Sequence, residues 1–187
     1  MTEKGTKRIV ADPLYFFCMA GGLAFGCVIA AFFGKELSKA SFAGGFAHAV
    51  PGAFSLRDVA LAFFLQAVPM LLLYYAAYGH LLRPTAAAVL AFRSIMGGCC
   101  IAASVRLFLS DDALSAVLVL LFVLFELLTL SLHLSFAYLA GHFFLSVKGQ
   151  GIRKSAVGQF TGDFLFFYGL ILFFYIVRGC ITALLNS

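Results

Sequence analysis

Long apolar runs, separated by short polar segments, cover most of this 187-residue chain. The longest run, residues 113–147, contains one acid, Glu126, two histidines, and no lysine, arginine or proline. A continuous helix satisfies the backbone of such a run in lipid, because every peptide group then bonds within the segment. At 1.5 Å per residue the helix would be about 52 Å long, against roughly 30 Å of hydrocarbon. We therefore expect it to tilt, to bend or to project from the membrane.

Four further runs are long enough to cross a bilayer, at residues 14–33, 58–82, 85–109 and 162–185. The short link between the second and third runs predicts an antiparallel hairpin, and Pro69 is expected to kink the second run. The pattern predicts an all-α fold, a polytopic transmembrane helix bundle of five spans that forms one domain over residues 1–187. The longest connection follows the first span, and its residues 41–54 either lie in the interface or enter the membrane as a re-entrant segment.

Small residues recur along one side of the predicted first span. Gly22, Gly26 and Ala30 are four residues apart, which places them on one ridge of a helix. Such a ridge lets a second helix approach closely in a membrane. A phosphate-binding role is disfavoured, because this glycine pattern lies inside an apolar run. Gly97 and Gly98 of the third predicted span are further candidates for helix packing.

The composition agrees with a membrane protein. Hydrophobic residues make up 63% of the chain and charged residues 11%, and the mean hydropathy is +1.04. This combination excludes a soluble globular domain. With 23 phenylalanines and no tryptophan, tyrosine and phenylalanine must fill the aromatic role at the membrane interface. Five spans leave no length for a separate soluble enzyme domain.

The formal net charge is +5, but the basic residues flank the apolar runs and form no basic and aromatic patch. Membrane topology and anionic lipid account for them better than nucleic acid does. With the N-terminus inside, seven basic residues fall in the cytoplasm and five on the other side. The first set is Lys4, Lys7, Arg8, Arg83, Lys148, Arg153 and Lys154, and the second is Lys35, Lys39, Arg57, Arg106 and Arg178. We therefore predict a multi-pass cell-membrane protein with a cytoplasmic N-terminus and an outside C-terminus.

Three ionisable residues inside the predicted spans form a candidate polar site. Glu126 and His133 are seven residues apart, which places them on one face of the fourth span. Arg93, in the third span, either snorkels to the near interface or turns inward, where it is an available partner for Glu126. Functionally, Glu126 and His133 could move a proton or hold a cation. The alternative is that Glu126 bonds between helices and fixes their packing.

Known signatures of cofactor sites and membrane enzymes are missing. His133 and His142 are nine residues apart, on opposite sides of a helix, so they cannot ligate one ion together. His48 and His80 offer no obvious partner at equal depth. The five cysteines form no CxxC motif and are interpreted as packing residues. With no HExxH, GxSxG or Walker sequence either, we predict no metal, no cofactor and no enzymatic activity.

The layout resembles the stage II sporulation protein M family of bacterial membrane proteins. The resemblance rests on a basic N-terminus, a long first loop, the second span LRDVALAFFLQAVPMLLLYYAAYG, and the sequence FRSIMGG in the third span. Within residues 69–98, a proline, leucines, Gly79, Pro84, and Phe92 with Arg93 ahead of two glycines follow a similar order. The resemblance implies a membrane scaffold that localises cell-wall-remodelling partners during sporulation engulfment and that performs no catalysis.

A second class of function is the membrane subunit of a small-molecule transporter, or a proton- or ion-coupled carrier. The small-residue ridge of the first span would then meet a coupling subunit. Six spans are usual for such subunits, so termini on one side of the membrane would favour the carrier. The expected partners are the lipid bilayer and other membrane or cell-wall-remodelling proteins, and self-association into a homo-oligomer is left open.

Overall fold

A computed structural model describes residues 12–37, 67–108, 113–151 and 153–185, and all regular structure in these ranges is helical. The principal elements are α2 (Pro13–Leu37), α5 (Leu82–Phe108), α6 (Ala113–Gln150) and α7 (Lys154–Leu185). A shorter apolar helix covers Ala67–Ala76. The all-α prediction is therefore confirmed for these parts of the chain.

Four of these helices are long and apolar enough to cross a membrane, and their apolar windows match the predicted first, third, fourth and fifth spans. The windows are Pro13–Phe32, Leu82–Val105, Ala116–Gly149 and Lys154–Ile181. For the predicted second span, the structure describes the helix Ala67–Ala76, which contains Pro69. Residues 58–66 and the predicted re-entrant segment, residues 41–54, lie outside the described residues. The count of five spans stays a prediction.

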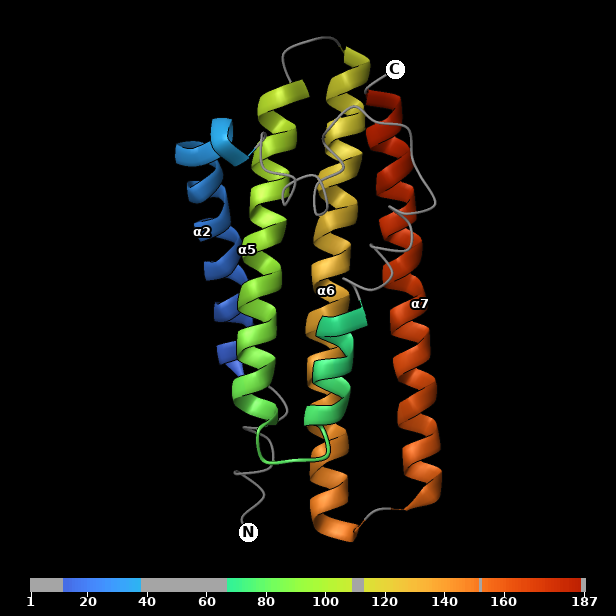
Figure 1. The fold of residues 1–187 in the computed structure, drawn as a ribbon. Coiled ribbons are helices and arrows are strands. Elements are labelled where there is room, and N and C mark those ends of the chain that lie inside the picture. Colours follow the sequence, from blue (N-terminus) through green and yellow to red (C-terminus); the bar gives the residue numbers. More distant parts are fainter. Residues whose placement is uncertain (1–11, 38–66, 109–112, 152, 186–187) are drawn as a thin grey trace.

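The helices α2, α5, α6 and α7 stand side by side in chain order (Figure 1). α2 and α5 run in the same direction, α6 runs back, and α7 returns beside it. With 38 residues, α6 is about 57 Å long, and its lower part extends past the lower end of α5 (Figure 1). The helix that was predicted to be longer than the hydrocarbon thickness thus projects past its neighbour α5.

The basic segment 148–161, which lies between the predicted fourth and fifth spans, is mostly helical. α6 continues to Gln150 and α7 begins at Lys154, so a very short turn joins them. Gly151 makes this turn with a φ of 76°, and its amide donates to the Val147 carbonyl over 2.9 Å. This is a left-handed helix cap, which favours glycine because a Cβ is strained there. Of the other glycines of the segment, Gly149 lies in the last turn of α6 and Gly158 lies in α7, and each is tolerated at about 1 kcal/mol.

α5 also begins earlier than predicted, at Leu82 instead of residue 85. Pro84 therefore lies in the first turn of the helix. A proline is accommodated there because the amides of the first turn have no carbonyl partner within the helix. The proline thus opens α5 where the prediction had placed it in a link.

α2 and α5 are in backbone contact along a glycine ridge. A Cβ added at Gly22 would lie 2.7 Å from the Ala91 carbonyl oxygen, and one added at Gly26 would overlap the Ile95 carbonyl oxygen. Gly98 faces the backbone of α2 in the same way. The matched order of these contacts shows that the two helices are parallel. In the structure, all three glycines lie at the contact between α2 and α5.

Two thiols and one small side chain also lie at the contact between α2 and α5. Ala30 is buried, 5% exposed, one turn beyond Gly26. The Cys27 thiol donates to the Gly98 carbonyl over 3.5 Å, and the Cys99 thiol donates to the Gly26 carbonyl over 3.3 Å. These cysteines act as small packing residues, and none of the five cysteines forms a disulfide.

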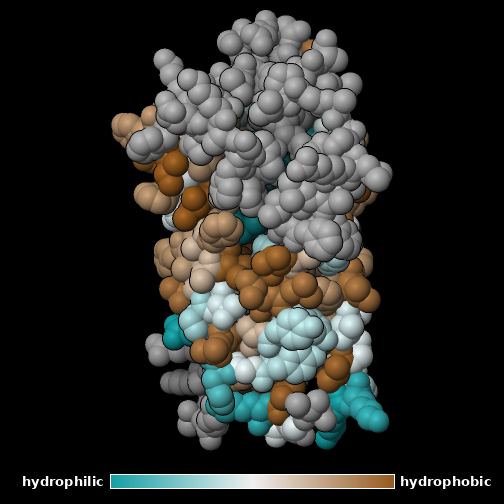
Figure 2. Space-filling model, viewed as in Figure 1, coloured by the Kyte–Doolittle hydropathy of each residue, from teal (hydrophilic) through white to brown (hydrophobic). Residues whose placement is uncertain are grey.

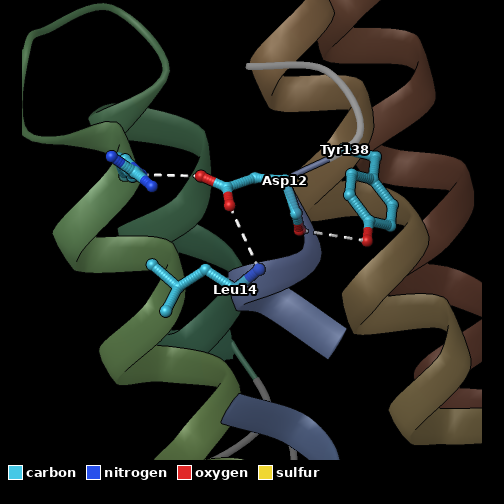
Figure 3. Close-up of polar contacts among 4 residues, drawn as sticks. Asp12, Leu14 and Tyr138 are labelled. Atoms are coloured by element: carbon cyan, nitrogen blue, oxygen red, sulfur yellow. Dashed lines mark hydrogen bonds and ion pairs between the residues drawn. The ribbon is translucent and has the colours of Figure 1, made fainter. Parts of the chain in front are cut away.

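Asp12 fixes the first turn of α2 to two other helices (Figure 3). Its carboxylate accepts from the Leu14 amide over 3.1 Å, which caps the helix N-terminus. The second carboxylate oxygen accepts from Arg83 Nε of α5 over 2.6 Å. The Tyr138 hydroxyl of α6 donates to the Asp12 carbonyl over 3.4 Å. Three contacts from one buried residue therefore position the start of α2.

Aromatic rings join the helix Ala67–Ala76 to α6 and α7. Tyr74 stacks on Phe160 with ring centroids 5.2 Å apart, and Phe160 stacks on Phe143 of α6 at 4.2 Å. The Tyr74 hydroxyl also bonds to the Thr161 hydroxyl over 2.9 Å. Met70, Leu73 and Ala77 belong to the same buried cluster and are fully buried. The largest buried cluster of the described chain therefore lies toward the end of the bundle where α6 ends and α7 begins.

The outer surface matches a protein that sits in lipid. Figure 2 shows an apolar middle and a hydrophilic lower end on the described part of the bundle. Large apolar side chains are exposed along the helices, among them Phe17 at 68% and Phe32 at 81%. Lys148, Arg153 and Lys154 are exposed at the turn between α6 and α7. Lipid would cover the apolar belt, and water would meet the basic end.

Candidate functional site

Three charged side chains from three helices meet inside the bundle. Arg93 of α5 places Nη1 3.3 Å from Oε1 of Glu126 on α6. Arg178 of α7 pairs through its own Nη1 with the other carboxylate oxygen, Oε2. All three residues are buried, with at most 4% of each exposed. We refer to Arg93, Glu126 and Arg178 as the charge triad.

The helical period of α6 explains how Glu126 reaches this position. Glu126, Thr129 and His133 recur at three and four residues, and all three are fully buried on one face. The Thr129 hydroxyl donates to the Phe125 carbonyl over 2.8 Å, and His133 Nδ1 bonds to the Thr129 carbonyl over 2.8 Å. The predicted shared face of Glu126 and His133 is present in the structure.

Gly97 makes room for the carboxylate of Glu126. A Cβ added at position 97 would lie 2.8 Å from Glu126 Oε1 and 3.2 Å from Leu130 Cδ1. Gly97 and Gly98 were both predicted to pack helices, but their positions differ by about 100° around α5. Gly98 therefore faces α2, whereas Gly97 faces the charge triad.

Arg178 is the member of the triad that sequence reasoning missed. The sequence-based topology counted it as a basic residue on the outer side, but it is 4% exposed and lies within the apolar window Lys154–Ile181. Its guanidinium carbon lies 5.0 Å from the ring centroid of Phe122 and 5.5 Å from that of Tyr175. Aromatic faces stabilise a buried cation by about 2 kcal/mol when water is excluded. An arginine inside an apolar run was the available signal.

The triad holds its helices together electrostatically. Two unit charges 3.3 Å apart attract each other by about 5 kcal/mol at an effective dielectric constant near 20. Much of this attraction offsets the cost of removing the charges from water. Deleting one partner is a different matter, because the remaining charge stays buried without compensation. The arrangement therefore opposes separation of α5, α6 and α7.

The other candidate groups lie apart from this site. The described contacts give no hydrogen bond or ion pair between His133 and Glu126, so the structure places Arg93, and not His133, against the carboxylate. His142 is exposed on the opposite side of α6 from His133. The His80 ring lies 6.0 Å from the Phe144 ring, near one end of the bundle. Position 48 lies outside the described residues.

The described structure defines a class, a polytopic α-helical membrane protein with an interhelical charge triad inside the bundle. Comparison of the chain with protein-family models, with curated proteins and with solved structures finds no match.

Proposed function

We propose that the chain is an integral membrane scaffold that anchors or localises cell-wall-remodelling partners and catalyses no reaction itself. The observation that carries this proposal is the charge triad, which joins α5, α6 and α7 through one carboxylate. A scaffold needs helices in a fixed arrangement, and opposed buried charges provide it. The likeness of residues 69–98 to the stage II sporulation protein M family supports the same role in a sporulating bacterium.

The attachment of α2 supports a rigid frame as well. Gly22 and Gly26 bring the α2 backbone against α5, and Asp12 ties the start of α2 to Arg83 and Tyr138. The four long helices are thus connected in sequence by glycine packing and by buried polar bonds. Their outward faces are left to lipid and to other membrane proteins.

We further propose five crossings, with the N-terminus in the cytoplasm. α2 and α5 are parallel (Figure 1), so the chain between them must return from one end of the bundle to the other. Arg83, Lys148, Arg153 and Lys154 lie at the end where α2 begins. A basic end is typical of the cytoplasmic side. Moving Arg178 from the outer surface to the interior increases this asymmetry.

Capture of partners from native membranes tests the scaffold. The tagged chain is cross-linked in sporulating cells, and the proteins that co-purify are identified by mass spectrometry. We expect a peptidoglycan hydrolase or an enzyme that acts with one. A matched variant replaces Arg93, Glu126 and Arg178 by methionine, and it should capture the same partner because the scaffold needs the helix arrangement and not the charges. An ATPase as the specific partner would instead support a transporter.

The carrier is the second candidate, and the burial of three ionisable groups inside the spans favours it. Purified protein in proteoliposomes is tested for proton or ion flux, together with Glu126→Gln. A carrier built on this residue loses flux while the amount of folded protein is unchanged. A scaffold shows no flux, and the substitution lowers only the amount of folded protein.

A further inference from the structure

The charge triad is unbalanced. Two guanidinium groups share one carboxylate, so the formal charge of this buried set is +1. Of the other acids whose side chains are described, Asp12 already pairs with Arg83, ten residues before Arg93 on α5, and Asp163 lies fifteen residues before Arg178 on α7. These spacings correspond to about 15 Å and about 22 Å of helix rise. A net positive charge in a low-dielectric interior is unfavourable unless an anion compensates it.

The hydrogen-bond donors of Arg93 show where such an anion would lie. Nη1 faces Glu126 Oε1 at 3.3 Å. The other two guanidinium nitrogens, Nε and Nη2, are fully buried and have no hydrogen-bond partner among the described residues. These two nitrogens form one edge of the planar group and direct two parallel N–H bonds outward, a geometry that matches the two oxygens of a carboxylate.

We propose that the Nε and Nη2 edge of Arg93 binds the carboxylate of a small organic acid or of a fatty acid within the bundle. The bound carboxylate would neutralise the triad and satisfy both buried donors. A chloride ion matches this edge less well, because it offers one acceptor centre in place of two. The proposal does not depend on the scaffold role, since a bound acid could equally be a structural ligand or a transported substrate.

Thermal unfolding of the full chain in lipid nanodiscs tests this site. Sodium acetate and sodium chloride are compared at equal ionic strength and pH 7, with sodium palmitate as a separate arm. We expect a saturable rise in Tm of a few degrees with a carboxylate beyond that with chloride. A rise in Tm with acetate indicates a ligand that comes from water. A rise with palmitate alone indicates a ligand that comes from the bilayer. The absence of a specific rise with either carboxylate would overturn the proposal.

Two variants and one direct measurement separate this site from surface binding. Arg93→Lys keeps the charge opposite Glu126 but lacks the planar edge, so it should lose the shift. Arg83→Lys, at an arginine whose side chain is 65% exposed, should keep it. In wild-type protein labelled with 15N-arginine, the 13C-carboxylate of whichever acid raises Tm, acetate or palmitate, should show dipolar coupling to a buried Nε. An unchanged shift in Arg93→Lys, or no such coupling, would overturn the proposal.

Discussion

The backbone contact between α2 and α5 makes Gly26→Ala a specific test of helix packing. A Cβ at position 26 would overlap the Ile95 carbonyl oxygen and lie 2.9 Å from its carbonyl carbon. Both are backbone atoms, so no change of rotamer can relieve the overlap, and α2 must move away from α5 by about 1 Å to clear it. A gap of this size loses roughly half of the van der Waals attraction of each contact. Overpacking of this kind costs about 1–3 kcal/mol.

Gly21→Ala is the matched control, because a Cβ at position 21 meets nothing within 4 Å. Both variants gain about 1 kcal/mol of helix propensity, so the difference between them isolates the contact with Ile95. Unfolding by SDS in mixed micelles, followed by circular dichroism, gives the two free energies. We expect Gly26→Ala to be less stable than Gly21→Ala by about 1–3 kcal/mol. Equal stability within about 0.5 kcal/mol would show that the two helices do not meet at this ridge.

Three further predictions follow from other contacts. Tyr74→Phe removes the hydroxyl that bonds to Thr161 and should lower the free energy of unfolding by about 1 kcal/mol. Tyr75→Phe is the control, because Tyr75 is 69% exposed, and it should change this free energy little in the same SDS titration. Asp12→Ala removes the cap of α2 and the partner of Arg83, so it should cost about 1–2 kcal/mol; stability equal to wild type would count against this anchor. Reporters fused to the two ends of the chain should be labelled from opposite compartments, and labelling from one compartment would contradict the five crossings.

The sequence predicted the long helices well, because a helix that crosses the hydrocarbon needs a continuous apolar run of about 20 residues, which is visible in the sequence. It predicted their ends less well. The segment 148–161 is rich in glycine and basic residues, which are typical of loops, yet most of it is helical, and Gly151 takes the left-handed conformation just after α6. A left-handed cap is a local property of one residue, so composition averaged over a segment does not locate it.

The candidate site was predicted in part. Helical periodicity placed Glu126 and His133 on one face, and Arg93 was recognised as an available partner for the carboxylate. Arg178 was not, because a pattern along one helix gives neither its rotation against its neighbours nor the depth at which a long side chain ends. The separate roles of Gly97 and Gly98 were hidden for the same reason, since only the fold shows which neighbour each side of α5 meets.

The free energy of unfolding of Glu126→Gln tests the central claim that a buried carboxylate joins three helices. Removing the charge leaves Arg93 and Arg178 buried without their partner, and we predict a loss of about 3–5 kcal/mol. Replacing all three residues by methionine should restore most of that loss, because well-packed apolar side chains substitute for a buried ion pair. Glu126→Gln as stable as wild type within about 0.5 kcal/mol, with the same helix content, would contradict the account.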